Sequence, residues 1–191
     1  MKLLIIPGSL RKESFNKKMA AAAEQIAKKI GFTTTLIHLD EFEIPVLNQD
    51  DSDTKPFPQD VQKMHELFKS HDAFLFVTPE YNASIPGGLK NVIDWASRSQ
   101  TPNTRSPCFI NKVAAIMSAS VSPYGGLRAI SHLRQVLTIL NVLVIPQEKT
   151  LPSAHEVFSS SSGIESHLKG MENVLSALFS LTSKTSNQSK S

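Results

Sequence analysis

The feature that most constrains the fold of this chain is a regular alternation of short apolar runs with amphipathic segments. The apolar runs have the length of buried β-strands and cover Leu3–Pro7, Thr34–Leu39, Ala73–Val77, Val113–Met117 and Val142–Ile145. Segments with apolar residues at helical spacing lie between them. Strands that alternate with helices in this way are typical of a parallel sheet covered on both faces. The alternation therefore predicts an α/β fold.

The ends of the helical segments can be predicted from the residues that typically start or stop a helix. Gly31 ends the first, the second ends near Ser70, Gly125 and Gly126 open the fourth toward Leu140, and an acidic, proline-containing loop is expected from Asp40 to Pro58. The third and last helices are expected over Gly88–Arg98 and Ile164–Leu181. The pattern suits a flavodoxin-like doubly wound five-stranded parallel sheet, order 2-1-3-4-5, with helices on both faces. In such a sheet, ligands bind outside the carboxyl ends of the strands. The loops after strands one, three and four are therefore the candidate site.

Length and composition predict one domain. The chain has 191 residues, of which 40% are hydrophobic, enough for one sizeable core. We expect a single domain over 1–182 and a disordered polar tail over 183–191. No apolar run is long enough to span a bilayer, and no cleavable signal is evident, which predicts a cytoplasmic protein. A single cysteine, Cys108, agrees with a reducing compartment. The net charge of +3 slightly favours anionic ligands, but no basic run indicates nucleic-acid binding.

The first candidate loop, Gly8 to Asn16, combines a glycine, serines, an amide and Arg11 just before a helix. Free backbone amides and the positive end of a helix dipole favour an anion, and Arg11 would add a charge-assisted contact. Ser14 or Asn16 would equally cap any helix. The spacing alone leaves a phosphate cradle and plain capping equally open. The loop is neither a P-loop nor a GxGxxG fingerprint.

The second candidate loop, Thr78 to Asn91, contains two prolines that restrict its path and two glycines that permit close approach. A rigid backbone with an exposed aromatic suits a planar heteroaromatic ring, with amides at its polar edge and Tyr81 beside its face. The alternative is an ordinary turn before a helix, with Tyr81 packed inward.

These segments resemble the NAD(P)H-dependent FMN reductases, a family that includes bacterial quinone and chromate reductases and azoreductase-like proteins. The segment GSLRKESFN resembles the phosphate loop of the family, and PEYNASIPGGLKNVIDWASR resembles its flavin-edge signature. The resemblance extends from Lys2 to about Glu148 and implies a flavodoxin-like fold, noncovalent FMN, NADPH or NADH as electron donor, and homo-oligomers. Cofactor-binding residues are expected at Ser9, Arg11, Ser14, Phe15, Asn16, Pro79, Glu80, Tyr81, Asn82, Ser118, Ser120, Gly125 and Gly126.

The resemblance also assigns roles within these loops. The first loop would hold the FMN phosphate, the second would border the isoalloxazine with Glu80 acting through its backbone, and Ser118–Gly126 would pass beside the pyrimidine end and ribityl chain. The two glycines of the third loop also suit an ordinary helix start. Because a flavin carries the hydride chemistry, no catalytic side chain is expected. A nicotinamide and then a small-molecule acceptor such as a quinone would use the same flavin face, which gives ping-pong kinetics.

Two other functional classes remain open. A flavodoxin-type electron carrier would bind FMN in the same fold without oxidising a nicotinamide, although such carriers tend to be acidic and this chain is slightly basic. A binding or scaffold protein could keep the fold without redox activity, although the loops look complete for a cofactor.

The remaining conspicuous residues are given structural interpretations. The histidines lack metal-ligand spacing, so no metal site is expected, and Cys108 is expected to be a packed or partly exposed thiol. A dimer is expected through the helices at Gly88–Arg98 and Gly126–Leu140, because Trp95 lies off the core stripe of the first and the apolar arc of the second is wide. By resemblance, Arg128 and Glu148 would link dimers into a tetramer.

Overall fold

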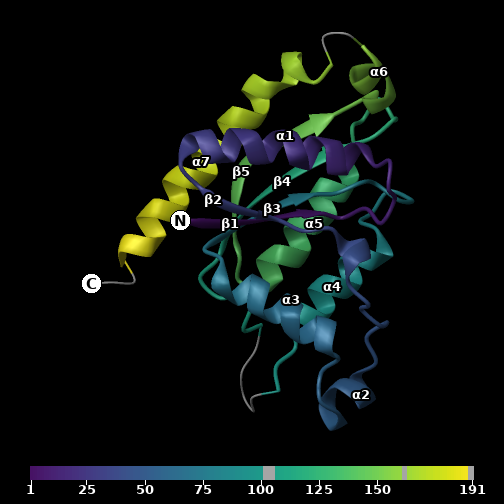
Figure 1. The fold of residues 1–191 in the computed structure, drawn as a ribbon, viewed down its shortest axis with the longest axis vertical. Helices are drawn as coiled ribbons and strands as arrows, with labels where there is room; N and C mark the ends of the chain where they lie inside the picture. The colour runs from purple at the N-terminus through teal and green to yellow at the C-terminus, as the bar shows by residue number, and fades with distance from the viewer. Residues whose placement is uncertain (101–105, 161–162, 189–191) are drawn as a thin grey trace.

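The apolar runs form one parallel sheet of five strands in the order β2-β1-β3-β4-β5, as Figure 1 shows. The structure is a computed structural model that describes residues 1–100, 106–160 and 163–188. Its strands are β1 (Lys2–Pro7), β2 (Thr33–Leu36), β3 (Ala73–Val77), β4 (Val113–Ala119) and β5 (Leu143–Leu151), and all neighbours pair in parallel. The predicted strand order is confirmed.

Helices cover both faces of the sheet. They are α1 (Phe15–Ile30), α2 (Gln49–Thr54), α3 (Gln59–Ser70), α4 (Gly87–Ser97), α5 (Leu127–Ile139), α6 (Ala154–Ser159) and α7 (Glu165–Gln188), with a 3-10 helix η1 at Leu39–Glu41. In Figure 1, α1 and α7 lie on one side of the sheet, and α3, α4 and α5 lie on the other. Successive residues of β1 point into different cores: Leu3 and Ile5 face the α1–α7 side, whereas Leu4 and Ile6 face the other side. This double burial explains why the central strands are apolar throughout.

Helix α1 has the start and stop that its sequence predicts. The Ser14 hydroxyl oxygen accepts from the backbone N–H groups of Asn16 and Lys17, which makes Ser14 the N-cap. Gly31 ends the helix in the left-handed region at φ 114°. Capping is thus one confirmed role of Ser14, and it holds the first loop at the carboxyl end of β1.

The prediction that Trp95 needs a partner from another chain is wrong. Trp95 is 3% exposed, its Nε1 donates to the Pro45 carbonyl over 2.7 Å, and its ring packs edge-on against Phe57. The loop from Asp40 to Pro58 folds over α4, so the side of the helix that turns away from the sheet is covered within the chain. This segment was expected to be only a loop, but it contains the short helix α2, capped by Asn48.

The carboxyl-terminal half departs from prediction in three places. Strand β5 extends to Leu151, and the sequence had not indicated α6. Helix α7 continues to Gln188, beyond the predicted end at Leu181 and into the segment expected to be a polar tail, while 189–191 lie outside the described residues. The polar end of α7 remains helical, and threonine hydroxyls there donate to carbonyls of the preceding turn. Thr182 donates to Leu178, and Thr185 donates to Leu181 and Thr182.

Candidate functional site

The loops after β1, β3 and β4 meet at the carboxyl ends of the central strands and enclose a small cavity. The cavity has a volume of about 120 Å³. It is lined by Ser9, Arg11, Ser14, Phe15, Asn16, Pro79, Glu80, Tyr81, Ala119, Ser120 and Val121. The structure therefore brings together nine of the predicted site residues from three separate parts of the chain. Sequence reasoning did not single out Ala119 and Val121, because apolar side chains carry no chemical signal of a site.

The first loop presents hydrogen-bond donors to this cavity. No described residue accepts from the backbone N–H groups of 12–15, which stand at the amino end of α1. The Ser9 oxygen accepts from the N–H of Arg11 over 3.3 Å, and the Ser14 oxygen caps α1, so each hydroxyl keeps its hydrogen for donation. Arg11 is exposed, and no described carboxylate pairs with its guanidinium. The loop is therefore a set of free donors with one unneutralised positive charge.

Asn16 lines the cavity, but its side-chain amide is already hydrogen-bonded to the protein backbone. Its side-chain N–H donates to the Ala119 carbonyl over 2.8 Å, and its Oδ1 accepts from the Ala119 N–H over 2.9 Å. The residue is 3% exposed. The amide thus joins the start of α1 to the end of β4, and only its second N–H is left to donate to a ligand.

The second loop forms a small hairpin that presents Tyr81. The backbone groups of Tyr81 and Ser84 exchange two hydrogen bonds of 2.9 and 3.0 Å, and the turn residues Asn82 and Ala83 have φ angles of 49° and 62°. Tyr81 is 47% exposed, so the alternative in which it packs inward is wrong. Asn82, predicted as a site residue, stands in the turn and does not line the cavity.

The Glu80 carboxylate is bound within the protein, and the expected contact of its backbone with a flavin stays a prediction. The carboxylate pairs with the Arg128 guanidinium and is 7% exposed. Burial favours the neutral acid, but the hydrogen bonds and charge of Arg128 and the N–H of Ala129 outweigh it and hold the pKa of Glu80 below its usual 4.5. The Glu80 carboxylate therefore stays ionised, and Arg128 of the same chain neutralises its charge beside the cavity.

In the third loop, only Ser120 of the predicted residues lines the cavity. Ser118 is fully buried and donates its hydroxyl to the Thr78 carbonyl over 2.6 Å, which ties the ends of β3 and β4 together. Gly125 and Gly126 have φ angles of 60° and 87°, and a Cβ on Gly126 would overlap the Ser118 hydroxyl. Ser118, Gly125 and Gly126 therefore determine the conformation of the loop but do not line the cavity.

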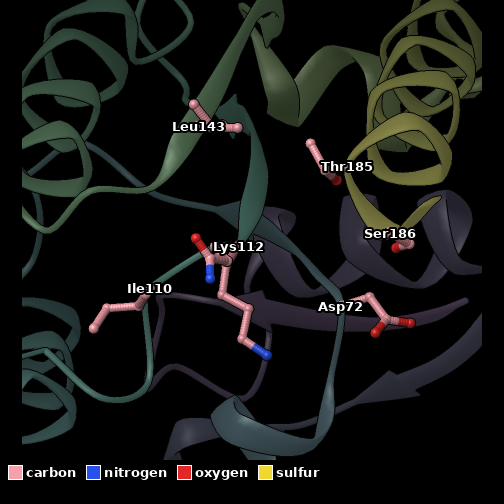
Figure 2. Close-up of a pocket in the computed structure, with 7 residues that line it drawn as sticks. Asp72, Ile110, Lys112, Leu143, Thr185 and Ser186 are labelled. Atoms are coloured by element: carbon pink, nitrogen blue, oxygen red, sulfur yellow. The ribbon is translucent and has the colours of Figure 1, made fainter. Parts of the chain in front are cut away.

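A larger cavity of about 490 Å³ lies at the amino ends of β3, β4 and β5, opposite the ends that carry the three loops (Figure 2). The Lys112 side chain crosses it, and its Nζ donates to the carbonyls of Lys69 and His71. Thr185 and Ser186 of α7 stand across the cavity from Lys112. Because the lysine is already engaged and ligands of such sheets bind at the carboxyl edge, we place the site in the smaller cavity.

The two charged residues expected to link dimers are paired within the chain. Arg128 binds Glu80, and Glu148 accepts from Arg134 over 2.9 Å. Within the described part of the chain, no group of three or more His, Cys, Asp or Glu side chains could hold a metal ion. No described helix is long and apolar enough to cross a membrane.

The geometry agrees with comparisons to known proteins. Residues 1–156 match the family model described as NADPH-dependent FMN reductase. The chain is 36% identical to a probable NADPH:quinone oxidoreductase of Oryza sativa subsp. japonica over 82% of this chain and 73% of the relative. It is 34% identical to the quinone reductase of Escherichia coli K12 over 89% and 90% of the two chains.

A solved structure extends the likeness to nearly the whole fold. The flavoenzyme NAD(P)H:acceptor oxidoreductase of Paracoccus denitrificans superposes with a TM-score of 0.80 at 26% identity, covering 96% of this chain and 98% of that one. Sequence and fold thus point to the same group of proteins, and the cavity lies where those folds bind ligands. The chain belongs to the NADPH-dependent FMN reductase family and is an FMN-dependent oxidoreductase.

Proposed function

We propose that this protein takes hydride from NAD(P)H and passes it, through noncovalent FMN in the three-loop cavity, to quinones, free flavins or similar small acceptors. The observation that carries the proposal is the first loop, where two serine hydroxyls and Arg11 line one cavity beside Ser14 and Phe15, whose backbone N–H groups have no described acceptor. Relatives named as quinone reductases support the acceptor class.

The residues present fit the phosphate end of FMN. A phosphate dianion needs several donors and a compensating positive charge, and the amino end of α1 supplies both. The cavity can hold only this end of FMN, because its volume is smaller than the 300 Å³ or more typical of a closed ligand pocket. A flavin held here must therefore extend onto the exposed rim, where Tyr81 and Val121 are 47% and 60% exposed.

FMN, when bound, supplies the hydride chemistry, and the protein positions and polarises the reacting groups. The Tyr81 N–H is used by Ser84 within the hairpin, but no described residue accepts from the N–H groups of Glu80 and Asn82. These two amides are the donors of the second loop that remain for a flavin edge. We propose that donor and acceptor use this exposed rim in turn, which gives ping-pong kinetics.

We also propose that the protein is at least a dimer, small-molecule ligands being its other partners. Trp95 is covered within the chain, but Tyr124, Leu127 and Ile139, on or next to α5, are 63%, 46% and 81% exposed. The family resemblance implies homo-oligomers, and these exposed side chains near the two ends of α5 are candidate contacts. A monomeric mass by sedimentation at micromolar concentration would overturn this proposal. The unpaired thiol of Cys108 fits a reducing compartment such as the cytoplasm.

The experiment that tests the function combines a spectrum with one assay. Purified protein should show a flavin spectrum and should oxidise NADPH when a quinone is added. A yellow protein that does not oxidise NADPH would favour the flavodoxin-type carrier. A colourless protein that stays inert after FMN is supplied would favour the scaffold alternative.

A further inference from the structure

The hairpin that presents Tyr81 is too small to hold its own orientation. It is closed by the two backbone hydrogen bonds between Tyr81 and Ser84, and its turn places Asn82 and Ala83 in the left-handed region. Alanine rarely adopts this conformation, and an isolated hairpin with a two-residue turn is at best marginally stable. Contacts outside the hairpin must therefore fix it.

The first such contact joins Glu80 to the amino end of α5. Helix α5 begins after Gly126, which has no side chain to cap it. Instead, one carboxylate oxygen of Glu80 accepts from the backbone N–H groups of Arg128 and Ala129 over 3.1 and 3.3 Å. The other oxygen accepts from Nε and Nη2 of Arg128 in a forked arrangement. Among the described residues, every hydrogen bond and ion pair of this buried carboxylate goes to the same helix end.

The second contact lies on the other side of the turn. The Ser84 hydroxyl is 3.0 Å from Nδ1 of His132. His132 is one helical turn after Arg128, so both side chains lie on the same face of α5. Residues on both flanks of the Tyr81 turn are thus attached to a single helix face.

We propose that Arg128 and His132 are positioning residues that clamp the Tyr81 hairpin against α5 and so set its orientation toward the flavin. This inference rests on the proposed function. The clamp aims the Tyr81 side chain and the free N–H groups of Glu80 and Asn82 as one rigid unit. It also keeps the negative charge of Glu80 paired, so that this charge does not oppose an electron-rich ligand nearby.

The test compares Arg128→Gln with a matched control on the same helix. Arg134→Gln also removes a charged fork from α5, but Arg134 binds Glu148 and the Ile145 carbonyl and does not contact the hairpin. Flavin-free wild type and variants are titrated with FMN and with riboflavin, and amide hydrogen exchange is followed at Tyr81 and Ser84. Because the Arg128 side chain is 54% exposed, we expect a modest effect. Both affinities should fall together by about threefold to tenfold in Arg128→Gln.

Exchange at the hairpin amides should become faster in the same variant, whereas Arg134→Gln should match wild type in both measurements. Unchanged flavin affinities and unchanged exchange in Arg128→Gln, with only a lower melting temperature, would mean that Arg128 merely stabilises α5 and would overturn the proposal. If Arg128→Gln does not fold, Ser84→Ala removes the second contact and must weaken both flavins equally for the proposal to stand. A wild type that binds neither flavin would contradict the proposed function, while the exchange measurements would still decide the clamp.

Discussion

Replacing Arg11 by Ala separates a phosphate cradle from simple helix capping. Arg11 lines the cavity, and capping of α1 is provided by Ser14. A hydrogen bond to a charged group contributes roughly 1.5–3 kcal/mol, and each 1.4 kcal/mol corresponds to tenfold in affinity. Arg11 is exposed, so solvent screens its charge and the lower end of this range applies. We therefore expect FMN affinity to fall by about tenfold.

The assay uses two ligands that differ only in the phosphate. Flavin-free wild type and Arg11→Ala are titrated with FMN and with riboflavin, and thermal unfolding is recorded for each protein. Riboflavin should bind wild type poorly, and its affinity should not change in the variant because the missing contact is to phosphate. The melting temperature without ligand should also stay the same, since Arg11 has no described partner in an ion pair.

Two controls show whether the effect is local. Lys12→Ala removes the same charge from the next exposed residue, which does not line the cavity, and should change FMN affinity much less. Ser14→Ala should lower the free energy of unfolding by about 1 kcal/mol because the cap of α1 is lost. Equal FMN affinity in wild type and Arg11→Ala would refute the assignment of Arg11 to the cradle.

Three further outcomes follow from the packing. Gly126→Ala should lower the free energy of unfolding by about 2–4 kcal/mol, because alanine is strained at φ 87° and its Cβ would overlap a β4 serine. Gly87→Ala, where nothing lies within 4 Å, should be neutral or stabilising, and equal urea midpoints for the two variants would contradict this reasoning. Burial raises the pKa of Cys108 to about 12, so the native thiol should resist iodoacetamide at about pH 8 and react only after unfolding. Burial also lowers the pKa values of His65 and His71 below 6.5, so the unfolded chain binds protons more readily there. The free energy of unfolding, measured with urea, should therefore fall as the pH drops through 6.5. A free energy of unfolding that does not change with pH there would contradict the burial of the two histidine side chains.

The regular elements of this protein could be predicted because their signals are local. Strand β3 has its predicted bounds, Ala73–Val77, and Gly31 ends α1 as expected. The predictions were wrong where a segment is stabilised by a distant one. Trp95 is covered by the loop from Asp40 to Pro58, where the Pro45 carbonyl accepts from its indole N–H. Hydropathy periodicity reports a residue's own helix face but not a loop that folds over it.

For the site, the sequence by itself determined which loops take part, because parallel strands that alternate with helices deliver their carboxyl ends to one edge. Only the tertiary structure decided what each side chain does there. Asn16 joins Ala119 across 103 positions and Glu80 joins Arg128 across 48, and neither pairing leaves a local signal. A buried polar group takes whichever partner the folded chain brings within reach. Nine of the eleven residues that line the cavity could therefore be predicted from the sequence, whereas the contacts that hold them in place were set by the fold.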